Sequence, residues 1–251
     1  MRAVFLYQIK KKAKKNQRIA DYSLDSDNKR IYQQRAKASK KKAVEIENTL
    51  KLSAHNKDIS VSKVNNTDSL ITLEELTDIK TRLSNIGIRN FNNADNLKTS
   101  AVIKPFVEQL EYLSEKYGEM FFRIDLVDLD KTDIAQVTPS KVLQLNVRYF
   151  NSSAEMNSII KEFIRKSILP KGADIKYIAA HEWGHYISMD DLHNSKSEMY
   201  KLFRRMKAKD FVSENAKVNI FEFIADSISC SVNKIPWKNA DKVLQYYVRR
   251  D

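Results

Sequence analysis

The chain has 251 residues, which is enough for one large domain or for one domain with a helical appendage. Its 42% apolar and 30% charged residues are ordinary for a soluble globular protein, and only four glycines and four prolines exclude collagen-like and low-complexity classes. The one cysteine, Cys230, excludes a disulfide framework and a multi-cysteine zinc site. The apolar run at residues 3–7 is too short for a signal peptide or a membrane span, so we expect a soluble protein in a reducing compartment.

The net charge of +12 is concentrated at the start of the chain. Residues 1–50 hold 14 Lys and Arg against 5 Asp and Glu, whereas residues 51–251 hold 30 against 27. The densest basic runs are Lys10–Lys15 and Lys40–Lys42. Such a segment is either a solvated basic helix or a contact for nucleic acid or an acidic protein surface. No base-reading motif accompanies the charge.

The N-terminal part predicts a basic helical arm. Residues 29–54 are rich in Lys, Ala, Glu and Gln and read as one long helix. Residues 53–69 are polar and predict a linker or exposed loop. We therefore divide the chain into an arm with its linker, residues 1–69, and a domain at residues 70–251.

Two further helices are predicted before the middle of the chain, at 72–84 and at 105–117. Thr72 and Glu75 form a potential capping box for the first. After a polar break at 90–96, a proline suits the first turn of the second helix and a glycine suits its end. The apolar side of the first helix consists of Leu73, Leu76, Ile79 and Leu83.

Strand-like patterns follow at 120–127 and 141–150, separated by the acidic loop 128–133 and by Pro139. The rest of the chain predicts helices. They are expected at 153–166, 175–188, 196–209 and 219–232, and after Pro236 up to about residue 248. Helices, then a short sheet, then helices predict an α+β fold.

The motif with the clearest chemistry is His181-Glu182-Trp183-Gly184-His185, an H-E-x-x-H sequence. On a helix, His181 and His185 share a face, so both imidazoles can reach one metal ion. Glu182 lies beside that face, where it can hold a water molecule near the metal. The composition alone would produce about 0.003 such motifs, and the apolar residues before it favour a buried helix over two surface histidines.

A catalytic zinc ion needs a third protein ligand and one open position. Asp191 has the spacing of a longer histidine motif, but Ser188 stands where that motif needs glycine. Glu222 is a carboxylate in an otherwise apolar helical stretch, where a metal would be a good partner, and Asp226 lies on the same face to support a ligand histidine. The alternative for Glu222 and Asp226 is that both acids face solvent on an ordinary core helix. The candidates for the third zinc ligand are therefore His55, Asp191, His193 and Glu222.

An H-E-x-x-H motif followed on a later helix by E-x-x-A-D, at Glu222–Asp226, resembles gluzincin-type zinc metallopeptidases. The flanking sequence is similar to the zincin-like metallopeptidase domain of phage minor-head and head-morphogenesis proteins and of mobile-element toxins. It is more distantly similar to the lethal-factor-like and Pro-Pro endopeptidase group. The resemblance covers about Leu143–Tyr247. Its further motifs are Leu145-Asn146, Tyr149-Phe150, Leu169–Gly172, Ile178–Ala180, Val212–Glu214 and Asn219.

The resemblance implies a zinc site built from His181, His185 and Glu222, with Asp226 supporting a histidine from outside. It implies that Glu182 transfers protons during hydrolysis of a peptide or protein substrate. The fold analogy suggests a substrate extended along the strand at 142–149. It also implies the bacterial cytoplasm or a phage particle as the location, without a membrane.

This sequence departs from the family seven residues before Glu222. The family usually has a tyrosine there as an oxyanion donor, whereas this chain has Asn215, the candidate oxyanion position. Tyr186 and Tyr200 are nearby in the sequence and are candidates to replace that tyrosine. We therefore expect weak or narrowly specific peptidase activity. The alternative is a structural protein of a phage or mobile element with little catalysis, whose basic arm binds nucleic acid or a partner protein.

Overall fold

The structure is a computed structural model that describes residues 68–118, 120–190 and 197–248. The chain divides into two compact units, of which the second comprises residues 66–129 and 134–251. The described residues, apart from residues 130–133, belong to this second unit. The helix expected at 29–54, the basic runs and most of the predicted linker lie outside the described residues.

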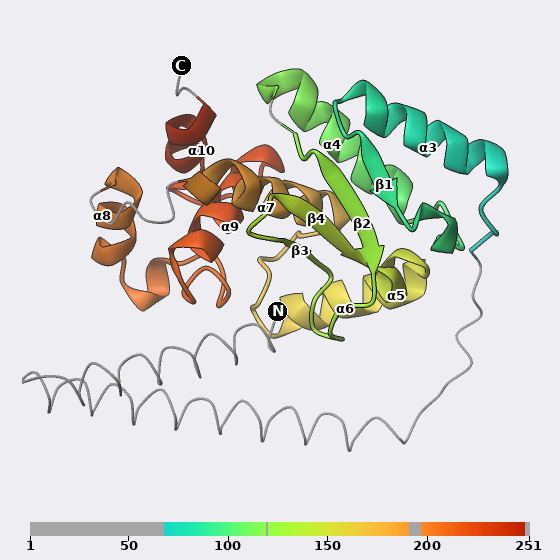
Figure 1. The fold of residues 1–251 in the computed structure, drawn as a ribbon. Helices are drawn as coiled ribbons and strands as arrows, with labels where there is room; N and C mark the ends of the chain where they lie inside the picture. The colour runs from blue at the N-terminus through green and yellow to red at the C-terminus, as the bar shows by residue number, and fades with distance from the viewer. Residues whose placement is uncertain (1–67, 119, 191–196, 249–251) are drawn as a thin grey trace, which may run out of the picture. The chain divides into compact units, whose positions relative to one another are not determined.

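The described residues form eight α-helices and one four-stranded sheet, which confirms the predicted α+β class (Figure 1). None of these helices is long and apolar enough to cross a membrane. The strands are β1 (Asn90–Asn92), β2 (Arg123–Val127), β3 (Ala135–Val137) and β4 (Val142–Asn146). The helices are α3 (Leu73–Asn85), α4 (Ile103–Tyr117), α5 (Val147–Phe150), α6 (Ser153–Arg165), α7 (Ile175–Ser188), α8 (Glu198–Arg205), α9 (Ile220–Val232) and α10 (Ala240–Val248).

The sheet has the strand order β1-β2-β4-β3. Strands β1, β2 and β4 run parallel, and β3 pairs antiparallel with β4. The two central strands bury an apolar face, because their apolar residues alternate with polar ones and are in register across the pair. Their buried apolar residues are Ile124, Leu126, Leu143 and Leu145.

The helix that carries the H-E-x-x-H motif lies at the centre of the unit. Helices α4 and α7 lie behind the sheet in Figure 1, and α7 packs against α4, β3 and α9. Helices α8 and α10 in turn pack against α9. Because α7 has neighbours on several sides, its residues from Tyr177 to Gly184 are all buried, including the polar ones.

Helix α3 begins as predicted. The Thr72 hydroxyl accepts a hydrogen bond from the Glu75 amide (3.1 Å), and the Glu75 carboxylate accepts one from the Thr72 amide (3.0 Å). Three of the four predicted core residues, Leu76, Ile79 and Leu83, are buried. Leu73 is 82% exposed because it is the first helical residue and extends beyond the core.

The strand predicted at 141–150 is wrong in its second half. β4 ends at Asn146, whose side chain accepts a hydrogen bond from the Arg148 amide (3.1 Å) and so begins the short helix α5. This turn buries both Tyr149 and Phe150. β1 and β3 were not predicted, since each has only three residues.

The pairing of β4 also contradicts the expectation that a substrate could add along this strand. β4 is hydrogen-bonded to β2 on one side and to β3 on the other, so the strand at 142–146 has no open edge. The sheet edge beside α7 is instead formed by β3.

Candidate metal centre

Helix α7 presents both histidines of the motif on one face. The helix begins after Asp174, whose carboxylate accepts a hydrogen bond from the Tyr177 amide (2.9 Å). His181 and His185 are one turn apart, and their ring centroids are 4.6 Å apart. His181 is only 2% exposed, so its imidazole must have polar partners inside the protein.

Helix α9 brings Glu222 to these histidines. Its N-cap is Asn219, whose side-chain oxygen accepts hydrogen bonds from the amides of Phe221 (2.7 Å) and Glu222 (3.0 Å). Glu222 therefore lies in the first turn, where the helix dipole favours a negative charge.

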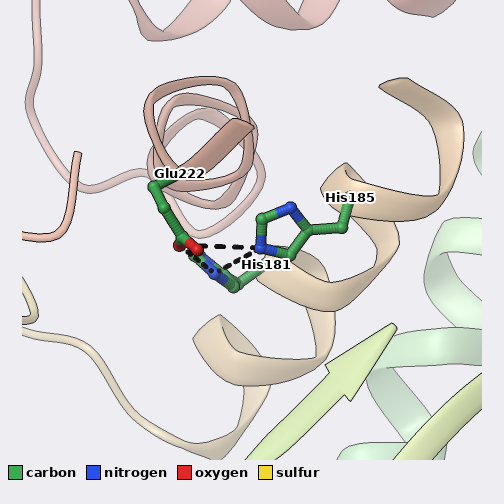
Figure 2. A group of neighbouring side chains, drawn as sticks. All are labelled: His181, His185 and Glu222. Carbon is green, nitrogen blue, oxygen red and sulfur yellow. Dashed lines mark hydrogen bonds and ion pairs between the residues drawn. The ribbon is translucent and has the colours of Figure 1, made fainter. Parts of the chain in front are cut away.

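The three side chains converge from α7 and α9, as Figure 2 shows. The Nε2 atoms of His181 and His185 are 3.0 Å apart, and Glu222 Oε2 is 3.3 Å from the first and 3.6 Å from the second. Ligand atoms about 2.0–2.1 Å from a tetrahedral zinc ion would be about 3.3 Å apart. The observed separations therefore match a set of ligands for one ion.

Asp226 holds the first histidine in the form that can bind a metal. Its Oδ1 lies 2.8 Å from Nδ1 of His181, deep in the core. Because a carboxylate only accepts, Nδ1–H must donate, so Nε2 is the ring nitrogen that lies beside Glu222 and His185 and that binds a metal once it is deprotonated. The sequence predicted this contact between Asp226 and a histidine of the motif.

His181 and Glu222 shift each other's pKa values in opposite directions. Burial opposes protonation of His181, but hydrogen bonds to Asp226 and Glu222 outweigh it and hold the pKa of the imidazole well above its ordinary value. Burial also opposes ionisation of Glu222, but the two imidazoles hold the pKa of its carboxyl well below its ordinary value. A divalent cation could take the place of a proton between the same three atoms.

Glu182 is a buried carboxylate with an unsatisfied oxygen. The residue is 3% exposed, and Oε2 has no hydrogen-bond partner among the described residues. Burial raises the pKa of this carboxyl, while the positive charge of the two imidazoles opposes the shift. An unsatisfied acceptor beside three candidate metal ligands is the arrangement expected of a proton acceptor for a water molecule.

Asn215 lies beside the third ligand. Its amide Nδ2 donates a 2.6 Å hydrogen bond to Oε2 of Glu222, and the residue is 5% exposed. The two tyrosines considered as replacements are packed elsewhere. The ring of Tyr186 packs on Phe121 with centroids 5.0 Å apart, and the guanidinium of Arg204 lies 5.8 Å from the Tyr200 ring centroid.

Two residues of the cluster were not predicted, Tyr177 and Ser213. The Tyr177 hydroxyl donates to Oδ1 of Asp226 (2.7 Å), and the Ser213 hydroxyl donates to Oδ2. Tyr177 precedes His181 by one helical turn, and this spacing was the only available signal. The other third-ligand candidates, at positions 55, 191 and 193, lie outside the described residues.

Comparisons with protein-family models, with curated proteins and with solved structures found no match to this chain. The convergence of His181, His185 and Glu222 is therefore what identifies a candidate metal centre here.

Proposed function

We propose that the chain is a zinc-dependent metallopeptidase of the gluzincin type. The observation that carries the proposal is the three-ligand cluster of His181, His185 and Glu222, with separations that suit one tetrahedral ion. A bound zinc ion would supply Lewis-acid activation of a peptide carbonyl and of a water molecule.

In this proposal, Glu182 moves the protons. Its buried carboxylate accepts a proton from the attacking water and then delivers it to the leaving amine. The direction of the pKa shift of Glu182 supports this role, because burial makes the carboxylate a stronger base. Asp226 supports His181, because the hydrogen bond to its buried carboxylate fixes the orientation of the imidazole ring.

The substrate in this proposal is an extended peptide that adds to the edge of β3. The Ile134 carbonyl accepts from the Asn146 amide (3.0 Å), and the Thr138 amide donates to the Val142 carbonyl (2.9 Å). Backbone groups alternate along a strand, so those of Ala135 and Val137 are directed away from β4. Main-chain hydrogen bonds to this edge would bind peptides with little dependence on side chains.

A second candidate is a metal-binding structural protein with little catalysis, as in particles of phages and mobile elements. The observation that favours it is the environment of Asn215. The side chain at the expected oxyanion position donates to Glu222 and is buried. Loss of one oxyanion donor typically costs about 100–1000-fold in turnover.

Digestion of a peptide library separates the two candidates. We expect slow cleavage by the zinc-loaded protein and none by Glu182→Gln, with zinc retained in both. Glu198→Gln, a change in an exposed glutamate of α8, serves as the matched control and should cleave normally. Cleavage that survives Glu182→Gln would exclude the proposed mechanism. A zinc-loaded wild-type protein that cleaves nothing would favour the structural protein.

A further inference from the structure

We infer that the loop at residues 213–216 is a positioning element for the metal centre, in which Asn215 orients the ligand Glu222 and Ser213 orients Asp226. This inference rests on the proposed metal site. It assigns Asn215 a structural relation to the ligand in place of the oxyanion role that its sequence position suggested.

Asn215 engages the oxygen of Glu222 that faces the histidines. Oε2 is the atom 3.3 Å from His181 Nε2 and 3.6 Å from His185 Nε2, and it also accepts the 2.6 Å hydrogen bond from Asn215. The contact atom of Asn215 must be its NH₂ group because an ionised carboxylate cannot donate. A carboxylate oxygen has two lone pairs, so this bond leaves one for a cation.

Ser213 acts in the same way on the other carboxylate. Its hydroxyl donates to Oδ2 of Asp226 and accepts a hydrogen bond from the Ala216 amide (2.8 Å). Its donor and one acceptor position are thus both used, which fixes the hydroxyl rotamer. Asp226 is therefore held through Oδ2 by the loop, while its Oδ1 is free to orient His181 and to accept from Tyr177.

The loop is itself anchored independently of the metal ligands. The Glu214 amide donates to the carbonyl of Ser167 (2.6 Å), just beyond α6, and the Val218 amide donates to the Asn215 carbonyl (2.9 Å). The loop is therefore fixed relative to the end of α6, and it contacts both Glu222 and Asp226. Such pre-organisation reduces the entropy that the ligands must lose when an ion binds.

Zinc affinity measured by competition with a chromophoric chelator tests this inference on the full chain. Asn215→Leu keeps the side-chain volume but removes the donor, and Ser213→Ala removes the hydroxyl. We expect each to weaken zinc binding about 10–100-fold, the usual cost of losing a supporting hydrogen bond. Ser213→Thr retains the hydroxyl and should restore affinity.

Asn233→Ala is the matched control, since it removes a 2.9 Å side-chain hydrogen bond to the Ser229 carbonyl at the opposite end of α9. It should leave the zinc affinity unchanged. The visible spectrum of the Co²⁺-loaded protein gives a second readout. We expect it to change in Asn215→Leu, because the geometry of Glu222 changes, and to stay constant in Asn233→Ala.

The outcomes separate this inference from the proposed function. Asn215→Leu and Ser213→Ala proteins that are folded and bind zinc as tightly as wild type would overturn the positioning role alone. If Asn215→Leu does not fold, the pair Ser213→Ala and Ser213→Thr decides the inference. A wild-type protein that binds no zinc would overturn the metal centre and the inference together. A fourth outcome is that the variants bind zinc more weakly while the wild-type protein cleaves no peptide. This outcome would support the inference and reject the peptidase.

Discussion

Gly184 of α7 lies directly against the backbone of Ala225 in α9. A Cβ atom on Gly184 would be 2.9 Å from the Cα of Ala225 and 3.4 Å from its carbonyl oxygen. The glycine inside the H-E-x-x-H motif thus allows the two helices to approach closely. Because Glu222 lies one turn before Ala225, this approach also sets the distance from Glu222 to the histidines.

We predict that Gly184→Ala separates α7 from α9. The added methyl group meets backbone, which cannot rotate away, so we expect a loss of about 1–3 kcal/mol in the free energy of unfolding. Zinc affinity should fall as well, since the ligands lie on the two separated helices. Urea unfolding of the metal-free protein and zinc competition measure the two effects.

Lys176→Ala is the control for this change, because Lys176 lies on the same helix with a half-exposed side chain whose ion pair is with the surface residue Glu108. It should alter neither stability nor zinc affinity by much. A Gly184→Ala protein with wild-type stability would mean that α7 and α9 are not as closely packed as described.

The ligand set makes a second prediction. The wild-type protein should retain about one zinc ion per chain after dialysis, as a three-ligand site requires. The double variant His181→Ala, His185→Ala and the single variant Glu222→Ala should both lose it. Metal analysis of the dialysed proteins measures this.

Two further variants distinguish the ligands from their neighbours. Asp191→Ala should keep zinc, whereas Asp226→Ala should weaken binding by about 10–100-fold because it orients His181 without contacting the ion. If Asp191→Ala loses zinc and Glu222→Ala retains it, the third ligand is Asp191 and not Glu222.

The sequence predicted the parts of this site that lie on regular helices. His181 and His185 are related by one turn, and so are Glu222 and Asp226, so periodicity alone placed each pair on a face. It could not predict the bond from Asn215 to Glu222 or the bond from Ser213 to Asp226. Those contacts depend on the path of an irregular loop, for which there is no repeating pattern.

Strand prediction failed for a related reason. The alternating apolar residues that form β4 continue in the sequence beyond the end of the strand. The chain nevertheless turns into α5 there, because Asn146 caps a helix. The three-residue strands β1 and β3 exist because longer strands pair with them. Their own residues carry too little pattern to predict a strand.

The pH dependence of stability gives a third prediction, at Glu75. Hydrogen bonds from Lys104, the Thr72 amide and Ser100 hold the pKa of this carboxyl at about 2, below its ordinary value of 4.5. A lowered pKa means that the stabilisation is complete above pH 4.5 and is lost as the pH falls through about 2. The stability difference between wild type and Glu75→Gln should therefore shrink with acidification.

Urea midpoints of both proteins, measured in parallel from neutral pH to about pH 2, test this prediction. Glu74→Gln is the control, because Glu74 is its exposed neighbour in the same helical turn. A difference that stays constant across the range would show that the Glu75 contacts do not depend on its charge.

The last prediction concerns where the folded unit begins. The carboxylate of Asp68 accepts hydrogen bonds from the amide (2.7 Å) and the hydroxyl (2.5 Å) of Ser153, the first residue of α6. It thus satisfies one of the amide groups that a helix leaves unpaired at its start. A fragment of residues 66–251 keeps these bonds, whereas a fragment of residues 70–251 lacks them.

We expect both fragments to fold and to bind zinc, because the metal ligands lie on α7 and α9. The shorter fragment should be less stable by about 1 kcal/mol, the usual cost of losing such a contact at a helix start. Asp68→Ala in the full chain should show the same loss. Limited proteolysis of the full chain should cut within residues 53–69, because the sequence predicts an exposed polar loop there and such loops are preferred cleavage sites. If the 66–251 fragment fails to fold, the residues before it contribute to the core, and the proposed separation of the basic arm is wrong.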